Sequence, residues 1–186
     1  MTPASGHTIL IMPCRDLATE LTAAVAGAVQ KIFGFATAFG PLLTDLAFAF
    51  DAAREQYHST PILKRLAEDA PEWALKIIAL VEVDLFIPIL THVYGEAQLG
   101  GKACIVSSYR LNDESWRHNA REKFLQRMIK EAIHELGHTF NLRHCRDHRC
   151  IMHYCRSEAD VDLKSEELCR YCRILLLDEI KKLTAW

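Results

Sequence analysis

The sequence lacks a strong net charge, a recognisable secretory leader and an uninterrupted apolar run. Its formal net charge is −2, so bulk electrostatics suggest neither a nucleic acid nor a membrane surface as a partner. The opening stretch MTPASGHTILIMPCRD has no basic start followed by an apolar core and a cleavage site, which argues against a signal peptide. We therefore expect an intracellular, cytoplasmic location in which thiols stay reduced.

Residues 32–50 form the longest mostly apolar stretch, and its length would suffice for a helix across a bilayer,. Gly40 and Pro41 interrupt the middle of this stretch, and Asp45 lies inside it. Such breaks favour the end of a core helix followed by a buried strand and a loop. We therefore expect no membrane span here.

The chain has 186 residues, of which 50% are hydrophobic, enough for one domain with a sizeable core. Apolar periodicity predicts strands over residues 8–12, 35–39, 75–83 and 103–108, and helices over residues 17–33, 59–66, 121–141 and 164–184,. Gly34 is a suitable residue to end the first helix. This order of elements predicts an α/β or α+β fold.

The strongest functional signal is the sequence HELGHTFNLRHC over residues 134–145. His134 and His138 are four residues apart, so on a helix they lie one turn apart on the same face. Two imidazole nitrogens can then bind one zinc ion at about 2.0–2.1 Å. The helix must end before His144 for this third histidine to reach the same ion. Three histidines leave a fourth position for water, as in a catalytic zinc site.

Glu135 directly follows the first histidine, so its side chain leaves the helix in a different direction. From there it can act as the general base that takes a proton from water attacking a carbonyl carbon and passes it to the leaving amine. A bare HExxH pattern also occurs in ordinary amphipathic helices. The third histidine at a suitable distance makes that alternative much weaker.

Five of the seven cysteines follow the histidine motif closely: Cys145, Cys150, Cys155, Cys169 and Cys172. Their paired spacing and the expected reducing location favour a metal site. Disulfides and free buried cysteines remain the alternatives. Cys14 ends a predicted strand, and we interpret it as a core residue.

The motif HELGHTFNLRH resembles the metzincin signature HExxHxxGxxH, with Asn141 in place of the family's glycine. Glycine there permits a left-handed turn after the helix, and asparagine is the next most tolerant residue. Met152 resembles the methionine of the turn beneath the zinc in metzincins, and a methionine filling core space agrees with that role. The resemblance implies a metzincin-like fold with a twisted mixed sheet and an active-site helix.

The sequence is similar, more narrowly, to archaemetzincins, whose signature continues with Cys, four residues, Cys, one residue and Met, then a distant CxxC. Residues 83–97 and 102–111 extend the similarity upstream. The spacing from Met152 to the CxxC is one residue shorter than in that family. The resemblance implies a structural zinc, closed to water, with four ligands: Cys145, Cys150, Cys169 and Cys172. Cys155, His148 and His153 are near enough in sequence to replace a ligand.

Two features have open alternatives. Tyr154, in the sequence Met-His-Tyr, resembles the tyrosine that steadies the oxyanion in astacins; a tyrosine packed under the site is the alternative. Residues 103–108 (ACIVSS) resemble the edge strand that lines the metzincin cleft, to which an extended peptide can add. An ordinary internal strand is about equally compatible with that sequence.

Together these features predict a zinc-dependent metallopeptidase with one catalytic and one structural zinc ion per chain, acting on a peptide or protein. Residues 1–144 would form a subdomain with the active-site helix, and residues 145–186 a smaller zinc-stapled subdomain of the same catalytic domain. The alternative function is a zinc-stabilised peptide- or protein-binding module with little or no proteolysis. No nucleic-acid or membrane partner is expected, and the sequence does not indicate the oligomeric state.

Overall fold

A computed structural model describes residues 7–14, 17–41, 45–112 and 120–184. Residues 1–6 of the stretch inspected for a leader, and residues 42–44 of the apolar stretch 32–50, lie outside these ranges. Across the described ranges, no helix combines the length and the apolar character that crossing a membrane requires.

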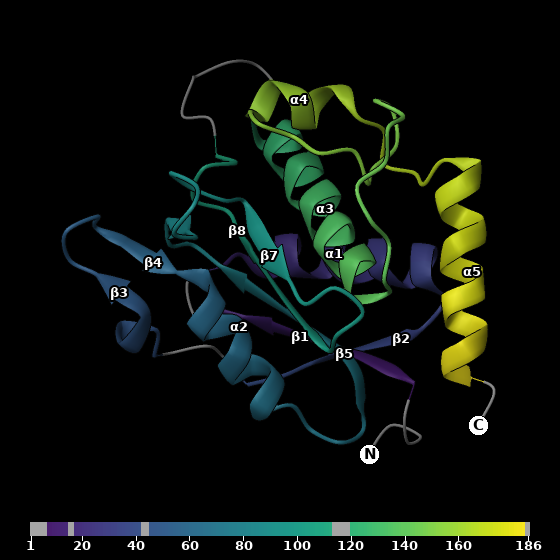
Figure 1. The fold of residues 1–186 in the computed structure, drawn as a ribbon, viewed down its shortest axis with the longest axis horizontal. Helices are drawn as coiled ribbons and strands as arrows, with labels where there is room; N and C mark the ends of the chain where they lie inside the picture. Colours follow the sequence, from purple (N-terminus) through teal and green to yellow (C-terminus); the bar gives the residue numbers. More distant parts are fainter. Residues whose placement is uncertain (1–6, 15–16, 42–44, 113–119, 185–186) are drawn as a thin grey trace.

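A five-stranded mixed sheet forms the centre of the molecule, in the order β2-β1-β5-β8-β7 (Figure 1). The strands are β1 (Thr8–Pro13), β2 (Ala36–Phe39), β5 (Ala74–Val81), β7 (Gly95–Ala97) and β8 (Ala103–Ser107). β1, β2, β5 and β8 run parallel, whereas β7 pairs antiparallel with β8. Parallel strands are covered on both faces, which explains the nearly continuous apolar sequence of β5.

Helices cover both faces of this sheet. α1 (Thr19–Phe33) and α3 (Ala120–Thr139) pack on one face, and α2 (Ser59–Glu68) packs on the other (Figure 1). Successive side chains of β5 alternate between the two cores: Ile78 and Leu80 face α1 and α3, while Ala79 and Val81 face α2,. The predicted α/β fold with a mixed sheet is confirmed, and Gly34 ends α1 in the left-handed conformation, with a φ of 75°.

The remaining elements, apart from the last helix, are short. A second, three-stranded sheet contains β3 (Phe50–Asp51), β4 (Gln56–His58) and β6 (Leu85–Phe86), preceded by the 3₁₀ helix η1 (Ala47–Ala49). After α3 the chain forms α4 (Glu158–Leu163) and α5 (Arg170–Thr184). The sequence analysis missed β3, β4, β6, β7 and α4, because elements this short carry little periodicity. A capping box between Ser157 and Asp160 was the available signal for α4,.

The structure corrects the strand that was compared with the cleft edge. Residues 103–107 form β8, which lies between β5 and β7 and is therefore internal. The edge strand beside β8 is β7, which pairs through residues 95–97 with residues 104–106 of β8. The apolar run Ala-Cys-Ile-Val of β8 reflects burial on both faces, which a cleft-lining edge strand does not require.

The structure also corrects the start of the last helix, which was expected at residue 164 and begins at Arg170. Lys164 is instead the C-cap residue of α4. Its side chain is fully buried, with Nζ 2.7 Å from Oε1 of Glu131 on α3. A buried ion pair of this kind cannot be recognised from local periodicity, because its partner lies far away in the sequence.

Candidate metal centres and cleft

The carboxyl end of α3 brings the three histidines together. His134 and His138 lie one turn apart on the helix, with their Nε2 atoms 3.1 Å apart. The ring centroid of His144 lies 5.3 Å from that of His134 and 4.9 Å from that of His138. One nitrogen from each residue lies within 4.8 Å of the other two, so the three side chains surround one point.

Asn141 provides the turn that returns the chain to this point. Its φ is 62°, in the left-handed region where the metzincin signature has glycine,. The backbone N–H groups of Asn141 and Gly100 both donate to the carbonyl of His138, each at 2.9 Å. These bonds satisfy the end of the helix in the manner of a left-handed cap, so the substitution preserves the geometry of the turn.

Backbone carbonyls orient two of the three imidazoles. Nδ1 of His134 bonds the Ile151 carbonyl at 2.9 Å, and Nδ1 of His138 bonds the Leu142 carbonyl at 2.7 Å. A carbonyl only accepts, so each Nδ1 carries the proton and each Nε2 presents a lone pair. Burial lowers the pKa of both imidazoles below the ordinary value, which favours the neutral form.

The two lone pairs of His134 and His138 therefore face each other, an arrangement that a cation between them would stabilise. Neutral imidazoles with a carbonyl on the other ring nitrogen are the usual ligands of zinc in proteins. His144, which follows the turn at Asn141, adds a third nitrogen. The residues of this group fit a zinc ion.

Glu135 lies buried between α3 and β7, and Gly95 makes this approach possible. A Cβ atom at Gly95 would lie 2.6 Å from Cγ of Glu135 and 2.6 Å from the carbonyl oxygen of Ile105. Burial raises the pKa of Glu135 well above its usual value; Glu131 raises it further and Lys164 lowers it. A carboxyl with a raised pKa is suited to accept and return a proton near neutral pH.

Gly95 and Gly137 allow close packing around the site, and the sequence analysis missed both. A Cβ at Gly137 would lie 2.6 Å from Sδ of Met152, which is fully buried beneath the helix. Glycine inside a helix costs roughly 0.5–1 kcal/mol relative to alanine. Its presence between two histidines was therefore a signal that another group approaches the helix closely.

Replacing Gly95 with alanine is expected to destabilise the protein by about 1–3 kcal/mol, because β7 must move away from a backbone carbonyl of β8,. The same shift separates Glu135 from the edge strand and should lower peptide hydrolysis. Gly27→Ala is the matched control, since an added Cβ there meets nothing within 4 Å and should stabilise α1 by up to about 1 kcal/mol. Urea unfolding measures both changes; a Gly95→Ala protein as stable and active as the unaltered chain would contradict this packing.

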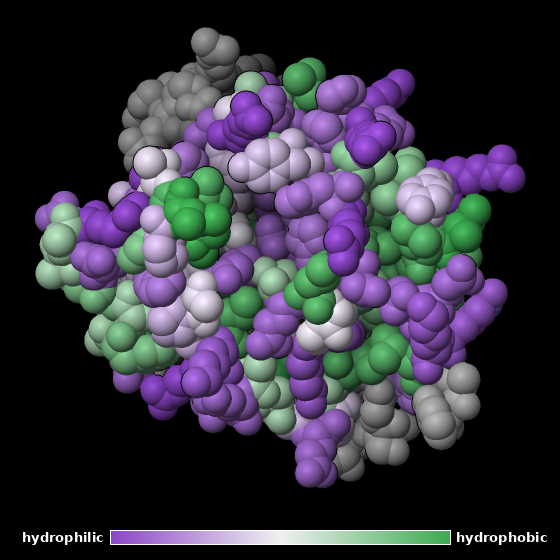
Figure 2. Space-filling model, viewed as in Figure 1, coloured by the Kyte–Doolittle hydropathy of each residue, from purple (hydrophilic) through white to green (hydrophobic). Residues whose placement is uncertain are grey.

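The histidines open into a cleft of about 340 Å³ between α3 and β7. Figure 2 shows the surface hollowed near the centre of the view, over these two elements. The wall contributed by β7 consists of Gly95, Glu96 and Ala97. Tyr154 contributes another part of the lining; the residue is 43% exposed, and its ring centroid lies 5.1 Å from that of His144.

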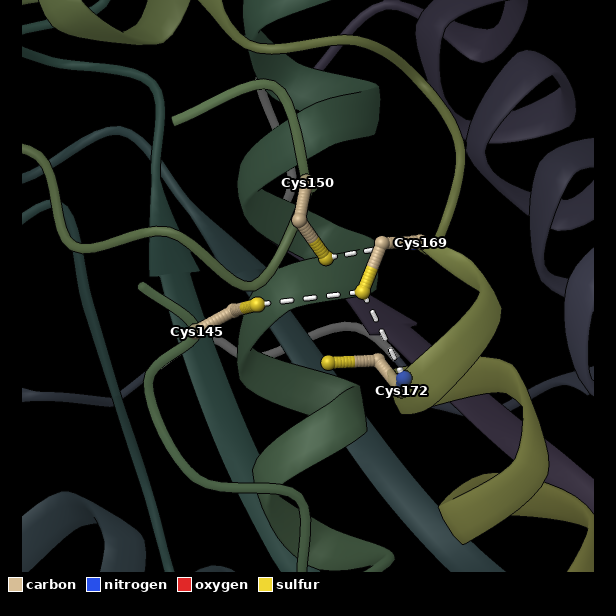
Figure 3. A group of neighbouring side chains, drawn as sticks. All are labelled: Cys145, Cys150, Cys169 and Cys172. Atoms are coloured by element: carbon tan, nitrogen blue, oxygen red, sulfur yellow. Dashed lines mark hydrogen bonds between the residues drawn. The ribbon is translucent and has the colours of Figure 1, made fainter. Parts of the chain in front are cut away.

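Four cysteines converge in a second group (Figure 3), whose first member, Cys145, directly follows His144. Sγ of Cys145 lies 3.8 Å from Sγ of Cys169, and all four ligand atoms lie within 4.8 Å of one another. The Cys169 N–H donates to Sγ of Cys150 at 3.3 Å, and the Cys172 N–H donates to Sγ of Cys169 at 3.5 Å. Burial would raise the pKa of Cys169, but the hydrogen bond from Cys172 contributes to holding it below the usual value.

This sulfur set also fits zinc, because four converging thiolates are the ligands of a closed structural site. All seven cysteines lie in the described ranges, and none of them is joined in a disulfide. Cys155 lies outside the group of four, and its Sγ donates to the His153 carbonyl at 3.6 Å. His148 and His153 also lie outside both groups and face each other instead.

Charged contacts attach the segment between the two cysteine pairs to α3. Arg127 forms two hydrogen bonds with the carboxylate of Asp162, at 2.7 and 2.8 Å. Lys164 and Glu131 form the buried ion pair, and Glu131 also lines the cleft. Glu131 lies one turn before His134, so this pair supports the part of α3 that carries the histidines.

The cleft contains three histidines and a carboxyl, with an edge strand along one wall and a four-cysteine group nearby. This combination is typical of a zinc metallopeptidase. The chain belongs to Peptidase family M54, whose profile matches residues 49–178. It is accordingly a metallopeptidase, and the predicted resemblance to archaemetzincins is confirmed by the relatives described next.

The chain is similar to archaemetzincins along most of its length. It is 35% identical over 173 residues to an archaemetzincin of Methanocaldococcus jannaschii, covering 91% of this chain and 93% of the relative. It is 37% identical over 137 residues to an archaemetzincin of Pyrococcus horikoshii, covering 72% of each. The crystal structure of archaemetzincin from Methanopyrus kandleri superposes with a TM-score of 0.82 at 30% identity, covering 97% of this chain and 99% of that chain.

Proposed function

We propose that the chain hydrolyses peptide bonds with water activated at the three-histidine zinc site, and that Glu135 is the general base. The observation that carries the proposal is the convergence of three ring nitrogens and a buried carboxyl on one cleft. His134, His138 and His144 would hold the ion. Zinc bound there supplies a Lewis acid that makes water more acidic and polarises a carbonyl.

Glu135 would take the proton of the attacking water and deliver it to the leaving amine. Burial of Glu135 favours this proton transfer, because a carboxyl with a raised pKa can both accept a proton and donate it again,. Met152 would contribute packing: it lies against Gly137 and keeps the helix turn between the two ligands in place. Proton transfer and support of the helix turn are thus assigned to two different side chains, Glu135 and Met152.

An extended substrate would bind along β7. This edge strand forms one wall of the cleft and approaches Glu135 at Gly95. Addition of a peptide strand uses main-chain hydrogen bonds and tolerates many side chains. The scissile bond would then lie across the carboxyl end of α3, within reach of Glu135.

Tyr154 is proposed to donate a hydrogen bond to the oxyanion that forms during attack, since it lines the cleft beside His144. Tyr154→Phe is then expected to lower kcat on the order of 10²-fold, the effect of losing one such donor. KM should change little, because the bond strengthens only in the transition state. Steady-state kinetics on one peptide measures both constants; unchanged turnover would remove Tyr154 from the mechanism.

The second zinc is proposed to be structural, held by Cys145, Cys150, Cys169 and Cys172. Its four thiolates leave no position for water, and the group joins the segment after His144 to the start of α5. We infer a content of two zinc ions per chain. In this proposal residues 145–186 are a smaller subdomain stapled by the metal to the part that carries the active-site helix.

The deciding experiment is cleavage of a peptide library before chelation, after treatment with 1,10-phenanthroline, and after zinc is restored. A peptidase that uses the histidine site should lose and then regain cleavage, while its zinc content falls and recovers. Metal analysis of the untreated chain should give two zinc ions; one or none contradicts the two-site assignment. Peptides that bind the zinc-loaded chain and stay intact would favour the binding module.

A further inference from the structure

His148 and His153 form a second histidine pair that the proposed mechanism does not use. His148 lies on the exposed turn between Cys145 and Cys150, and His153 follows Met152. Nδ1 of His148 and Nε2 of His153 are 3.1 Å apart, with the rings inclined at 66°. We propose that this pair is a third metal site, which binds a borderline divalent cation such as Zn²⁺.

The distance between the two nitrogens suits two ligands of one ion. At zinc–nitrogen distances of about 2.0–2.1 Å, nitrogens this far apart subtend roughly 100° at the metal, between the tetrahedral and square arrangements. The Nε2 atoms of His134 and His138 have the same 3.1 Å separation. The second pair therefore reproduces the spacing of the first.

The orientation of His153 is that of a metal ligand. Its Nδ1 donates to the Cys145 carbonyl at 2.8 Å, so Nε2 carries the lone pair and faces His148,. A backbone carbonyl on the far ring nitrogen fixes metal-binding histidines in this way. His134 and His138 have the same kind of partner. His148 can offer Nδ1 as its own lone pair when the proton resides on Nε2.

Exposure completes the site. His148 is exposed and His153 is half-buried, so water can supply the remaining ligands of the ion. Imidazole with water suits zinc, copper and nickel better than calcium or magnesium.

The third ion would lie next to both proposed zinc centres. His153 and Cys145 are joined by a parallel β-bridge, and the Cys145 N–H donates to the Met152 carbonyl at 2.8 Å. Cys145 belongs to the sulfur group, and Met152 lies beneath the histidines. Bound metal would therefore clamp the turn that connects the two centres.

The test is titration of the full chain, already carrying its tight zinc, with Zn²⁺ buffered from nanomolar to high micromolar. The unaltered chain should bind one zinc more than each of His148→Gln and His153→Gln. His7→Gln, which changes another exposed histidine, should keep the additional ion. An equal zinc content in the unaltered chain and both pair variants would overturn the site.

A second measurement needs no substitution. In the unaltered chain, ring-nitrogen NMR should show His148 and His153 shifting together as the additional zinc binds, while His7 stays unchanged. Ring signals that do not respond would mean that the two nitrogens share only a hydrogen bond. Both readouts are independent of peptide cleavage, so this site can fail while the proposed function stands, and the reverse also holds.

Discussion

Replacing Glu135 with glutamine is expected to lower kcat/KM for peptide hydrolysis by about 10²–10⁴-fold, the usual contribution of a general acid–base group. Glutamine keeps the shape of the side chain and can still lie against Gly95. It cannot accept the proton of the attacking water or return it to the amine. The loss should therefore appear in kcat, measured by steady-state kinetics.

Zinc content separates this outcome from damage to the metal site. Glu135→Gln should retain both zinc ions, because His134, His138 and His144 are unchanged. Glu122→Gln is the matched control, since Glu122 lies exposed in the first turn of the same helix and should leave turnover unaltered. If Glu135→Gln cleaves peptides as fast as the unaltered chain, the proton acceptor must be another group.

Replacing Cys169 with serine is expected to remove one zinc ion per chain and to lower the free energy of unfolding by more than about 4 kcal/mol. Loss of a bound metal is one of the few single changes with an effect this large. The upper limit is roughly 10–16 kcal/mol, the apparent binding free energy of structural zinc in finger peptides. The buried core around β1, β5 and β8 contributes stability of its own. The loss in the free energy of unfolding should therefore stay below that limit.

Cys155→Ser is the control for this experiment, because Cys155 is a neighbouring thiol outside the group of four. It should keep both zinc ions and change stability far less. Metal analysis and urea unfolding of the two variants are read together. If Cys155→Ser loses a zinc ion and Cys169→Ser keeps it, Cys155 replaces Cys169 in the ligand set.

The histidine group was predictable because its information is local. His134 and His138 are brought together by one helical turn, and His144 returns after a turn whose left-handed residue, Asn141, was visible in the motif,. The long strands and helices were predictable for a similar reason, since several periods of apolar residues mark each of them. The four cysteine ligands were predicted by comparison with a family signature, because the two pairs lie far apart in sequence.

The edge strand β7 and the buried pair of Lys164 and Glu131 could not be predicted in the same way. Three residues carry too little periodicity to define a strand, and its position at the edge depends on how β8 pairs on both sides. Lys164 was predicted to begin the last helix, whereas its side chain is buried against Glu131. In both cases the deciding contact joins residues distant along the chain.

The position of the sulfur group also has a consequence for the order in which the parts of the chain fold. α5 lies at one side of the molecule (Figure 1), and its exposed hydrophobic side chains include Tyr171, Ile174 and Leu177. Hydrophobic side chains gather in that part of Figure 2. Cys145 and Cys150 come soon after α3, whereas Cys169 and Cys172 arrive with α5, and joining the two pairs closes a loop at a cost in chain entropy. Attachment of α5 is therefore expected to be the late step of folding, with a rate set by the supply of zinc ions.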